Sequence, residues 1–508
     1  MRKKLVILIL IILFGISYSQ NIKDLDIIIE KGELFEAEKA VKHKLINNDS
    51  LSQQEIRYLK KQLNRIKNIK ENYPYTYDDM FNRLKTDIPD LTKKEILKWE
   101  KNKTLEYRII NGQKKYFWAF PFNLFVLNKE AENRRIKKNR SGNNPKKYNS
   151  IMHKKTVITE GKKSKTPFVV PKKITVCFTF FEDISEIPEG ETIRGWLPIP
   201  REILKQKNIK IIKVEPKNYL ISNKNNYLNA SVYVEKQVSR NNEETSYWRN
   251  YFYHPPLKWI KPLSSPEKLI NRDVMVFQII FKYTAYAYYR NINPQSISAY
   301  DTCSFVYKNY TREESPHIKF TKYLSKLSNE IIGNETNNYL KAKKIYNWIC
   351  KNITWTNPDY DSPGCLSDYI ARARRGDCGS KALLFTTLCR LNKIPARLQG
   401  GWMTRPDRLH SQHGWAQMYI EPYGWLTVDP DAGSHLIDSD DEKLKYFHFG
   451  NCDSYRLIIY DDNVPLFPLK IFGCSSDGSV TGGLQLGAFE WSGGELESNV
   501  KIDTYVEN

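Results

Sequence analysis

Three side chains suited to covalent acyl chemistry follow one another late in the sequence: Cys378, His413 and Asp429. The sequence Gly-Asp-Cys-Gly around Cys378 precedes a run in which apolar residues recur every three or four positions, as on one face of a helix. We expect this helix to begin at or just before Cys378 and to end near Asn392, because Pro395 cannot continue it. The unpaired N–H groups of a helix N-terminus favour an anion, so this position favours a reactive thiolate.

The histidine and the aspartate fall on the two strands of a predicted hairpin. Residues 413–420 indicate one strand, residues 422–424 a turn, and residues 425–429 the returning strand. This hairpin places a base, His413, beside a carboxylate, Asp429, that can orient it. With a cysteine on a helix packed against the sheet, the three residues form the nucleophile, base and orienter of covalent acyl transfer.

The parity of the hairpin is a constraint on this arrangement, because side chains alternate faces along a strand. If Ile420 paired directly with Trp425, Asp429 would lie opposite Ala416 and point away from the face that carries His413. The triad therefore requires a loop of odd length or a bulge, and Gly424 is the residue that can supply the left-handed conformation for either.

The same residues carry a resemblance to a known family. Gly-Asp-Cys-Gly before an apolar helix, His-Gly-Trp opening a strand and Trp-Leu-Thr-Val-Asp-Pro closing the hairpin resemble the transglutaminase-like superfamily. The segment 342–355 also resembles the one that precedes the nucleophile there, and the resemblance spans residues 311–435. It implies a papain-like core in which the cysteine-bearing helix packs on an antiparallel sheet. The superfamily includes transglutaminases, cysteine proteases and peptide N-glycanases.

Two of the three assignments have rivals nearby. His413 is preferred to His410 as the base, because it begins the strand and matches the histidine and tryptophan pattern of the superfamily. Asp429 is preferred to Asp431, because Asp431 lies beyond Pro430, where the strand should have ended. The resemblance also suggests Trp355 as an oxyanion donor beside the Cys378 backbone N–H, since some members use a tryptophan upstream of the nucleophile.

No cofactor and no metal site are expected. The sequence has no Cys-x-x-Cys or His-Glu-x-x-His spacing, and the acidic run at residues 438–442 lacks the spaced ligands and glycine of a calcium loop. Eight cysteines permit disulfides, but they are too sparse for a disulfide scaffold. Cys452 and Cys474 share the C-terminal segment and are a possible pair.

The predicted fold class is α+β: a papain-like transglutaminase core with an N-terminal helical region and a β-sandwich-like domain. Apolar stripes with helical spacing and two capping boxes mark the helices, and alternating apolar residues mark the strands. The chain of 508 residues is too long for one ordinary core. We expect a signal peptide at 1–19, a helical region at 20–130, a basic linker at 131–168, the β-sandwich-like domain at 169–300, the catalytic core at 311–450 and a C-terminal β segment at 451–508.

The N-terminus predicts export. Basic residues precede an apolar run that is short for a transmembrane span, and small residues follow it, which indicates a signal peptide cleaved before Gln20. No later stretch is long and apolar enough to span a bilayer. We therefore expect a secreted or periplasmic protein. The formal charge of +22 is spread over the whole chain without a nucleic-acid motif, so no nucleic-acid partner is expected.

These observations predict a secreted cysteine enzyme that acts on amide bonds of peptide or protein substrates through a Cys378, His413 and Asp429 triad and a thioester. Hydrolysis, as in a protease or amidase, is the first expectation. A first alternative is transfer of the side-chain acyl group of a protein glutamine to an amine, which would cross-link proteins. A second is a non-catalytic cell-surface or glycan-binding protein that keeps the fold. The sequence does not fix the oligomeric state.

Overall fold

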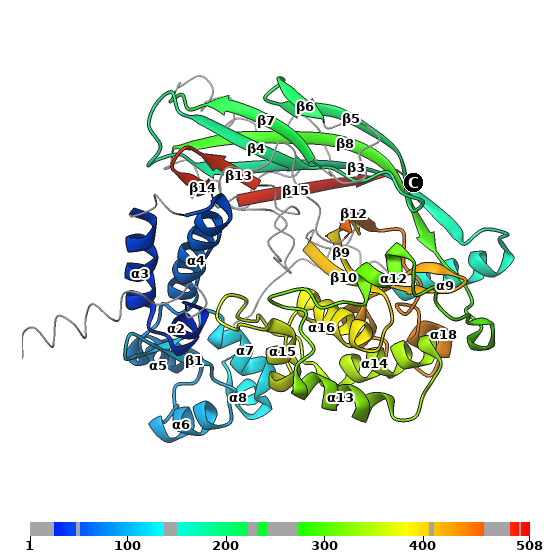
Figure 1. Cartoon of the computed structure of the whole chain (residues 1–508), viewed down its shortest axis with the longest axis horizontal. Helices are drawn as coiled ribbons and strands as arrows, with labels where there is room; N and C mark the ends of the chain where they lie inside the picture. The colour runs from blue at the N-terminus through cyan, green and yellow to red at the C-terminus, as the bar shows by residue number, and fades with distance from the viewer. Residues whose placement is uncertain are drawn as a thin grey trace, which may run out of the picture. The chain divides into compact units, whose positions relative to one another are not determined.

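The protein has an α+β fold, shown here as a computed structural model that describes residues 25–46, 51–136, 150–221, 231–240, 273–405, 411–461, 488–496 and 499–507 (Figure 1). Contacts divide the chain into two compact units: unit 1 holds residues 1–141 and 354–369, and unit 2 holds residues 142–353 and 370–508. The predicted signal peptide lies outside the described residues. Within them, no helix has the length and apolar character needed to cross a membrane.

Unit 1 is mainly helical, as its sequence predicts. Its first helices bury one apolar stripe each in a common core with α4. Its elements are α2 (Leu25–Lys31), α3 (Leu34–Ile46), α4 (Gln53–Asn72), α5 (Tyr77–Asp87), α6 (Lys93–Lys101), β1 (Tyr107–Ile110), β2 (Gln113–Tyr116), α7 (Phe120–Leu127) and α8 (Lys129–Arg134).

Capping boxes set where three of these helices begin. The predicted boxes at Ser52 and Thr92 are confirmed: each side chain accepts from the backbone N–H three residues on, and the glutamate there binds back. A third box, at Thr76, starts α5 with an aspartate in place of the glutamate. These local bonds satisfy N–H groups that have no partner within the helix.

Residues 354–369 belong to unit 1 although they are remote in sequence from its other residues. The Asp359 carboxylate accepts from the Tyr73 hydroxyl at 2.7 Å. Asn123 of α7 donates to the carbonyl of Asn357 at 2.8 Å and accepts from its N–H at 3.0 Å. These bonds from buried side chains fix the segment to α4 and α7.

The sandwich in unit 2 is built from two antiparallel sheets around one apolar core. The first has the strand order β14-β13-β4-β7-β6 and the second β15-β3-β8-β5. Figure 1 shows the C-terminal strands, in red, within these sheets beside the green strands. The bounds are β3 (Phe168–Asp183), β4 (Thr192–Pro198), β5 (Gln206–Glu215), β6 (Tyr219–Ile221), β7 (Ser231–Gln237), β8 (Val274–Tyr288), β13 (Ala488–Trp491), β14 (Gly494–Leu496) and β15 (Asn499–Val506).

The alternation predicted for β3 places its apolar residues in that core. Ile174, Val176, Phe178 and Phe180 are all buried there. The C-terminal strand β15 pairs with β3 along its whole length, with Ile502 opposite Phe178. The C-terminal segment therefore completes the sandwich.

The rest of unit 2 is a helical layer on a four-stranded antiparallel sheet with the order β11-β10-β9-β12. Helix α16 packs against β10 and β9. The elements are η3 (Pro294–Ser296), α12 (Phe305–Tyr310), α13 (Lys322–Ile332), α14 (Asn338–Asn352), α15 (Leu366–Ala373), α16 (Cys378–Leu391), β9 (Ala396–Met403), β10 (Ser411–Ile420), β11 (Gly424–Val428), α17 (Pro430–Ser434), α18 (Glu442–Lys445) and β12 (Arg456–Asp461). Of these, α15 begins in the part of the chain assigned to unit 1.

Strand β12 joins the two parts of unit 2. Its Leu457 and Ile459 belong to the apolar core of the sandwich, as does Trp402 of the neighbouring β9. The buried Gln206 amide of β5 donates to the Ile458 carbonyl at 2.8 Å and accepts from its N–H at 2.6 Å. The sandwich and the four-stranded sheet therefore share side chains and hydrogen bonds, which the predicted separate domains did not anticipate.

The segment predicted to be a basic linker differs from that expectation over more than a third of its length. Residues Ser150–Lys163 form helix α9, which packs on β3. Val157 and Ile158 are buried, and so is Lys154, at 8% exposure. The lysine-rich composition concealed an apolar stripe that is sufficient to hold this helix on the sheet. The predicted domain boundaries otherwise stay predictions.

Candidate active site

Cys378 is the first residue of α16, where its sequence predicted a helix start. The Asp377 carboxylate caps the helix by accepting from the Ser380 N–H at 2.9 Å. The helix ends at Leu391, with Asn392 as its C-cap, as predicted. Cys378 is partly exposed, whereas the rest of the helix from Gly379 to Arg390 is buried. The fold therefore holds one thiol rigidly at the end of a buried helix.

The hairpin has the odd-length loop that the triad requires. Ile420 pairs with Gly424, which leaves three residues in the loop, and Gly424 has φ +77°. Ala416 pairs with Val428, so the next residue, Asp429, comes level with Trp415. Trp415 is on the same face of β10 as the residue two before it, His413. The parity condition set by the sequence is thereby confirmed.

His413 contacts both of the other two residues. The Cys378 side chain lies close enough to His413 to raise the pKa of its imidazole, and Nε2 of His413 lies 2.7 Å from Oδ2 of Asp429. The His413 side chain is 11% exposed and that of Asp429 is fully buried. Because Nε2 faces the carboxylate, Nδ1 is the nitrogen that remains for the thiol. The structure thus brings together the three residues predicted to act as nucleophile, base and orienter.

The charges around His413 and Asp429 favour a protonated imidazole beside an ionised carboxylate. Burial alone would lower the pKa of His413, but the Asp429 carboxylate and Cys378 outweigh it and hold that pKa well above its ordinary value. Burial alone would raise the pKa of Asp429, yet His413 and Arg456 hold it well below its ordinary value. The imidazole therefore tends to keep a proton, and the carboxylate stays ionised beside it.

Both oxygens of the Asp429 carboxylate are occupied. Oδ1 accepts from the Ala432 N–H at 2.9 Å, in the first turn of α17. Oδ2 accepts from His413 and also lies 2.8 Å from Nη2 of Arg456, whose side chain is 2% exposed. Three donors on different segments therefore fix the plane of this carboxylate.

Arg456 is a residue that the sequence interpretation did not single out. It is the first residue of β12, and its Nε lies 3.3 Å from Oδ2 of Asp453. Its Nη2 is 3.5 Å from Nδ1 of His448. Burial would lower the pKa of Arg456, but Asp429 and Asp453 raise it, so the guanidinium is charged. A charged residue opening the apolar run Leu-Ile-Ile-Tyr, three residues after an aspartate, is the signal that could have revealed it.

The rival aspartate has another partner. Asp431 accepts from Nζ of Lys381 at 2.9 Å, and the Lys381 side chain, on α16, is 2% exposed. The same ammonium lies 3.2 Å from the Ser434 hydroxyl. Asp431 therefore binds the nucleophile-bearing helix to α17. The rival histidine, His410, lies outside the described residues.

Trp355 lies in unit 1, in the segment fixed by Asp359 and Asn357. Its indole is 40% exposed and packs edge-on against Phe122, with ring centroids 5.6 Å apart. Its role as an oxyanion donor stays a prediction. The Cys452 and Cys474 pairing also stays a prediction, because Cys474 lies outside the described residues; Cys452 itself is buried.

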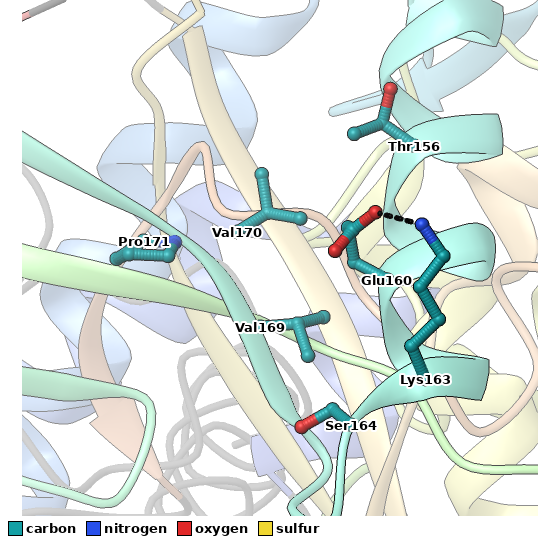
Figure 2. Close-up of a pocket in the computed structure, with 7 residues that line it drawn as sticks. All are labelled: Thr156, Glu160, Lys163, Ser164, Val169, Val170 and Pro171. Atoms are coloured by element: carbon teal, nitrogen blue, oxygen red, sulfur yellow. Dashed lines mark hydrogen bonds and ion pairs between the residues drawn. The ribbon is translucent and has the colours of Figure 1, made fainter.

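A separate pocket of about 520 Å³ lies between α9 and β3. Figure 2 shows Glu160 of α9 directed toward Val169 and Val170 of β3, with the Lys163 ammonium 3.1 Å from the Glu160 carboxylate. Neither the cysteine, the histidine nor the aspartate of the candidate site lines it. Its charged groups already bind each other, so it offers no reactive side chain.

Part of the chain is similar to known proteins. Residues 325–430 match the profile of the transglutaminase-like superfamily core. No curated protein matches the sequence. Among solved structures, a "putative cysteine protease" from Cytophaga hutchinsonii is similar at 15% identity and a TM-score of 0.41, over 67% of this chain and 92% of that one. The periplasmic domain of TgpA from Pseudomonas aeruginosa is similar at 11% identity and a TM-score of 0.25, over 57% of this chain and 93% of that one. Residues 325–430 of this chain thus belong to the transglutaminase-like superfamily.

Proposed function

We propose that this protein is a cysteine enzyme that acts on amide bonds of peptides or proteins through Cys378, His413 and Asp429. The observation that carries the proposal is the series of neighbouring side chains from the Cys378 thiol through the His413 imidazole to the Asp429 carboxylate, with 2.7 Å between Nε2 and Oδ2. Burial rises along it, from the partly exposed Cys378 to the fully buried Asp429. A substrate can therefore reach the sulfur, while water is kept from the carboxylate.

The first half of the reaction would form a thioester. His413 takes the proton of Cys378, and the thiolate attacks the carbonyl carbon of an amide. The oxyanion that results is held by the Cys378 backbone N–H and one further donor, for which Trp355 is the candidate. The C–N bond then breaks as the imidazolium of His413 gives its proton to the leaving nitrogen. Asp429 orients the ring and stabilises its positive charge.

The second half would release the acyl group. His413 takes a proton from water, the resulting hydroxide attacks the thioester, and the C–S bond breaks to return the thiolate and a carboxylic acid. If a primary amine replaces water, the product is a new amide and the enzyme is a cross-linking transferase. We propose hydrolysis as the main reaction of an exported protein, with amine transfer as the alternative.

Mass spectrometry of a peptide library incubated with the full chain tests the function. A library with and without a primary amine should give cleaved or deamidated peptides for hydrolysis, and amine adducts for transfer. The Cys378→Ala variant should give neither, while the matched variant Cys303→Ala, which changes an exposed thiol, should behave as wild type. An unchanged library with both wild type and Cys378→Ala would instead indicate a non-catalytic protein that keeps the fold, and equal products from both would reject Cys378 as the nucleophile.

A further inference from the structure

We propose that Arg456 is a positioning residue of the candidate active site: it fixes the Asp429 carboxylate against His413 and, by its charge, sets the upper pH limit to which the imidazole of His413 stays protonated. The inference rests on the proposed function, because it concerns the same three residues. Arg456 binds the Asp429 carboxylate and would act on the reaction through that carboxylate.

The first support is that Arg456 and His413 share one oxygen. Nη2 of Arg456 lies 2.8 Å from Oδ2 of Asp429, and Nε2 of His413 lies 2.7 Å from the same atom. The other oxygen is held by the Ala432 N–H. The carboxylate is therefore oriented by two donors that do not depend on the imidazole. Its charge is also divided between two cations whenever His413 is protonated.

The second support is the place of Arg456 in the sheet. Arg456 pairs with Met403 of β9, and Met403 pairs with Ser411 of β10, two residues before His413. Paired residues share a face, so Arg456 and His413 lie on the same face of the sheet, two strands apart. Gly401, opposite His413 in the strand between them, carries no side chain on that face. A Cβ on Gly401 would stand 1.7 Å from the Leu457 carbonyl oxygen, so the glycine lets β12 lie close against β9, with Arg456 on the face that carries His413.

The third support is that the guanidinium packs on an aromatic ring and is bound by two carboxylates. It lies over the ring of Trp415, 4.8 Å from the centroid, and the Trp415 indole donates to the buried Gln399 amide at 2.5 Å. Asp453 binds its Nε. A buried arginine kept by a carboxylate, an aromatic ring and the triad aspartate has little freedom to move, which suits a positioning role.

The charge of Arg456 weakens the attraction between the Asp429 carboxylate and a protonated His413. A lone buried carboxylate would stabilise the imidazolium strongly, whereas the Arg456 charge on the same oxygen offsets part of that attraction. Removing Arg456 should therefore let His413 keep its proton to higher pH. The other titratable or charged groups around the cluster are Asp453, Cys452, His448, Arg405, Lys154 and His153 from α9, Tyr346 and Cys350 from α14, and Cys378 from α16.

The test is the pH dependence of Cys378 alkylation by iodoacetate, followed by peptide mass spectrometry of the full chain. Iodoacetate is an anion, so its rate falls when the neighbouring imidazolium loses its proton. We call this fall of the alkylation rate at high pH the alkaline limb of the profile. In Arg456→Met we expect the alkaline limb to move to higher pH by about one pH unit. Arg456→Lys keeps the charge and should keep the limb near its wild-type position. The control Arg390→Met removes another buried arginine, paired with Glu314, and should leave the limb in place.

Each outcome decides the proposal. A limb that stays in place or moves down in folded Arg456→Met would overturn it. If Arg456→Met does not fold, the double variant Arg456→Gln with Asp453→Asn removes one charge of each sign. It should still move the alkaline limb to higher pH. Loss of the fold in that variant as well would assign Arg456 to stability alone and reject a role at the site. Since alkylation needs no amide, a wild-type limb with no peptide turnover would reject the proposed function and leave this inference standing.

Discussion

Gly414 of β10 lies so close to Gly379 of α16 that a methyl group on Gly414 would stand 3.1 Å from the Cα of Gly379. His413 and Cys378 are the residues next to these two glycines in the sequence. The closeness of the two backbones therefore sets how near the imidazole comes to the thiol. The glycines act through the space that they leave between strand and helix.

Gly414→Ala should separate the thiol from the imidazole. The contact is with backbone atoms, so strand and helix must move apart by a few tenths of an ångström. Since a displacement of about 1 Å can cost about a hundredfold in rate, we expect kcat to fall on the order of tenfold with a small change in Tm. Ser411→Ala, at an exposed position of the same strand, is the control and should keep the wild-type kcat. An unchanged kcat in Gly414→Ala would show that the distance does not limit turnover.

Asp429→Asn should shift the pH profile downward. The pKa of His413 is held well above its ordinary 6.5 in large part by the Asp429 charge, so the imidazolium persists as the pH rises through neutrality. Without that charge the ring loses its proton at lower pH, and the alkaline limb of kcat should move down. This direction is opposite to that expected for Arg456→Met. We also expect kcat to fall about 10³- to 10⁴-fold, as in triads that lose their carboxylate.

Asp431→Asn is the matched control for that profile. Its carboxylate binds Lys381 and is 13% exposed. The limb should therefore stay where it is in the wild type. A similar downward shift in both variants would show that general charge, rather than the contact with His413, controls the profile.

Lys381→Met should destabilise the protein more than a surface lysine change does. Lys381 is 2% exposed, and its removal leaves the Asp431 carboxylate without its partner in a nearly buried site. Breaking such a pair costs about 3 kcal/mol, measured as the free energy of unfolding in urea. Lys326→Met, whose side chain is 80% exposed and lies 4.0 Å from Glu330, should change it by less than about 0.5 kcal/mol. Equal losses of unfolding free energy in the two variants would show that the pair of Lys381 with Asp431 does not stabilise the packing of α16 on α17.

The local features of the site could be predicted from the sequence. Helical periodicity located the start of α16 at Cys378, and the hairpin pattern located His413 and Asp429. Even the odd loop followed from parity, because strand side chains alternate with a period of two. Each of these inferences depends on residues within one element or on two elements joined by a short turn.

What could not be predicted depends on pairings between distant segments. Arg456 reaches the triad only because β12 pairs with β9, and no local sequence pattern predicts that pairing. The pairing of β15 with β3 links strands more than three hundred residues apart, as Ile502 and Phe178 show. Helix α9 was missed because lysine composition outweighed a short apolar stripe. Contacts of this kind are specified by packing across the fold rather than by local pattern.

The ratio of iodoacetamide alkylation rates at Cys378 and Cys303 in one sample at pH 6 tests the central claim most directly. Cys303 is exposed and serves as the internal reference. If His413 holds the Cys378 proton in an ion pair, Cys378 should react on the order of ten times faster or more, and His413→Ala should bring the ratio to one or below. A ratio near one in the wild type, unchanged by His413→Ala, would contradict a catalytic pair at this site.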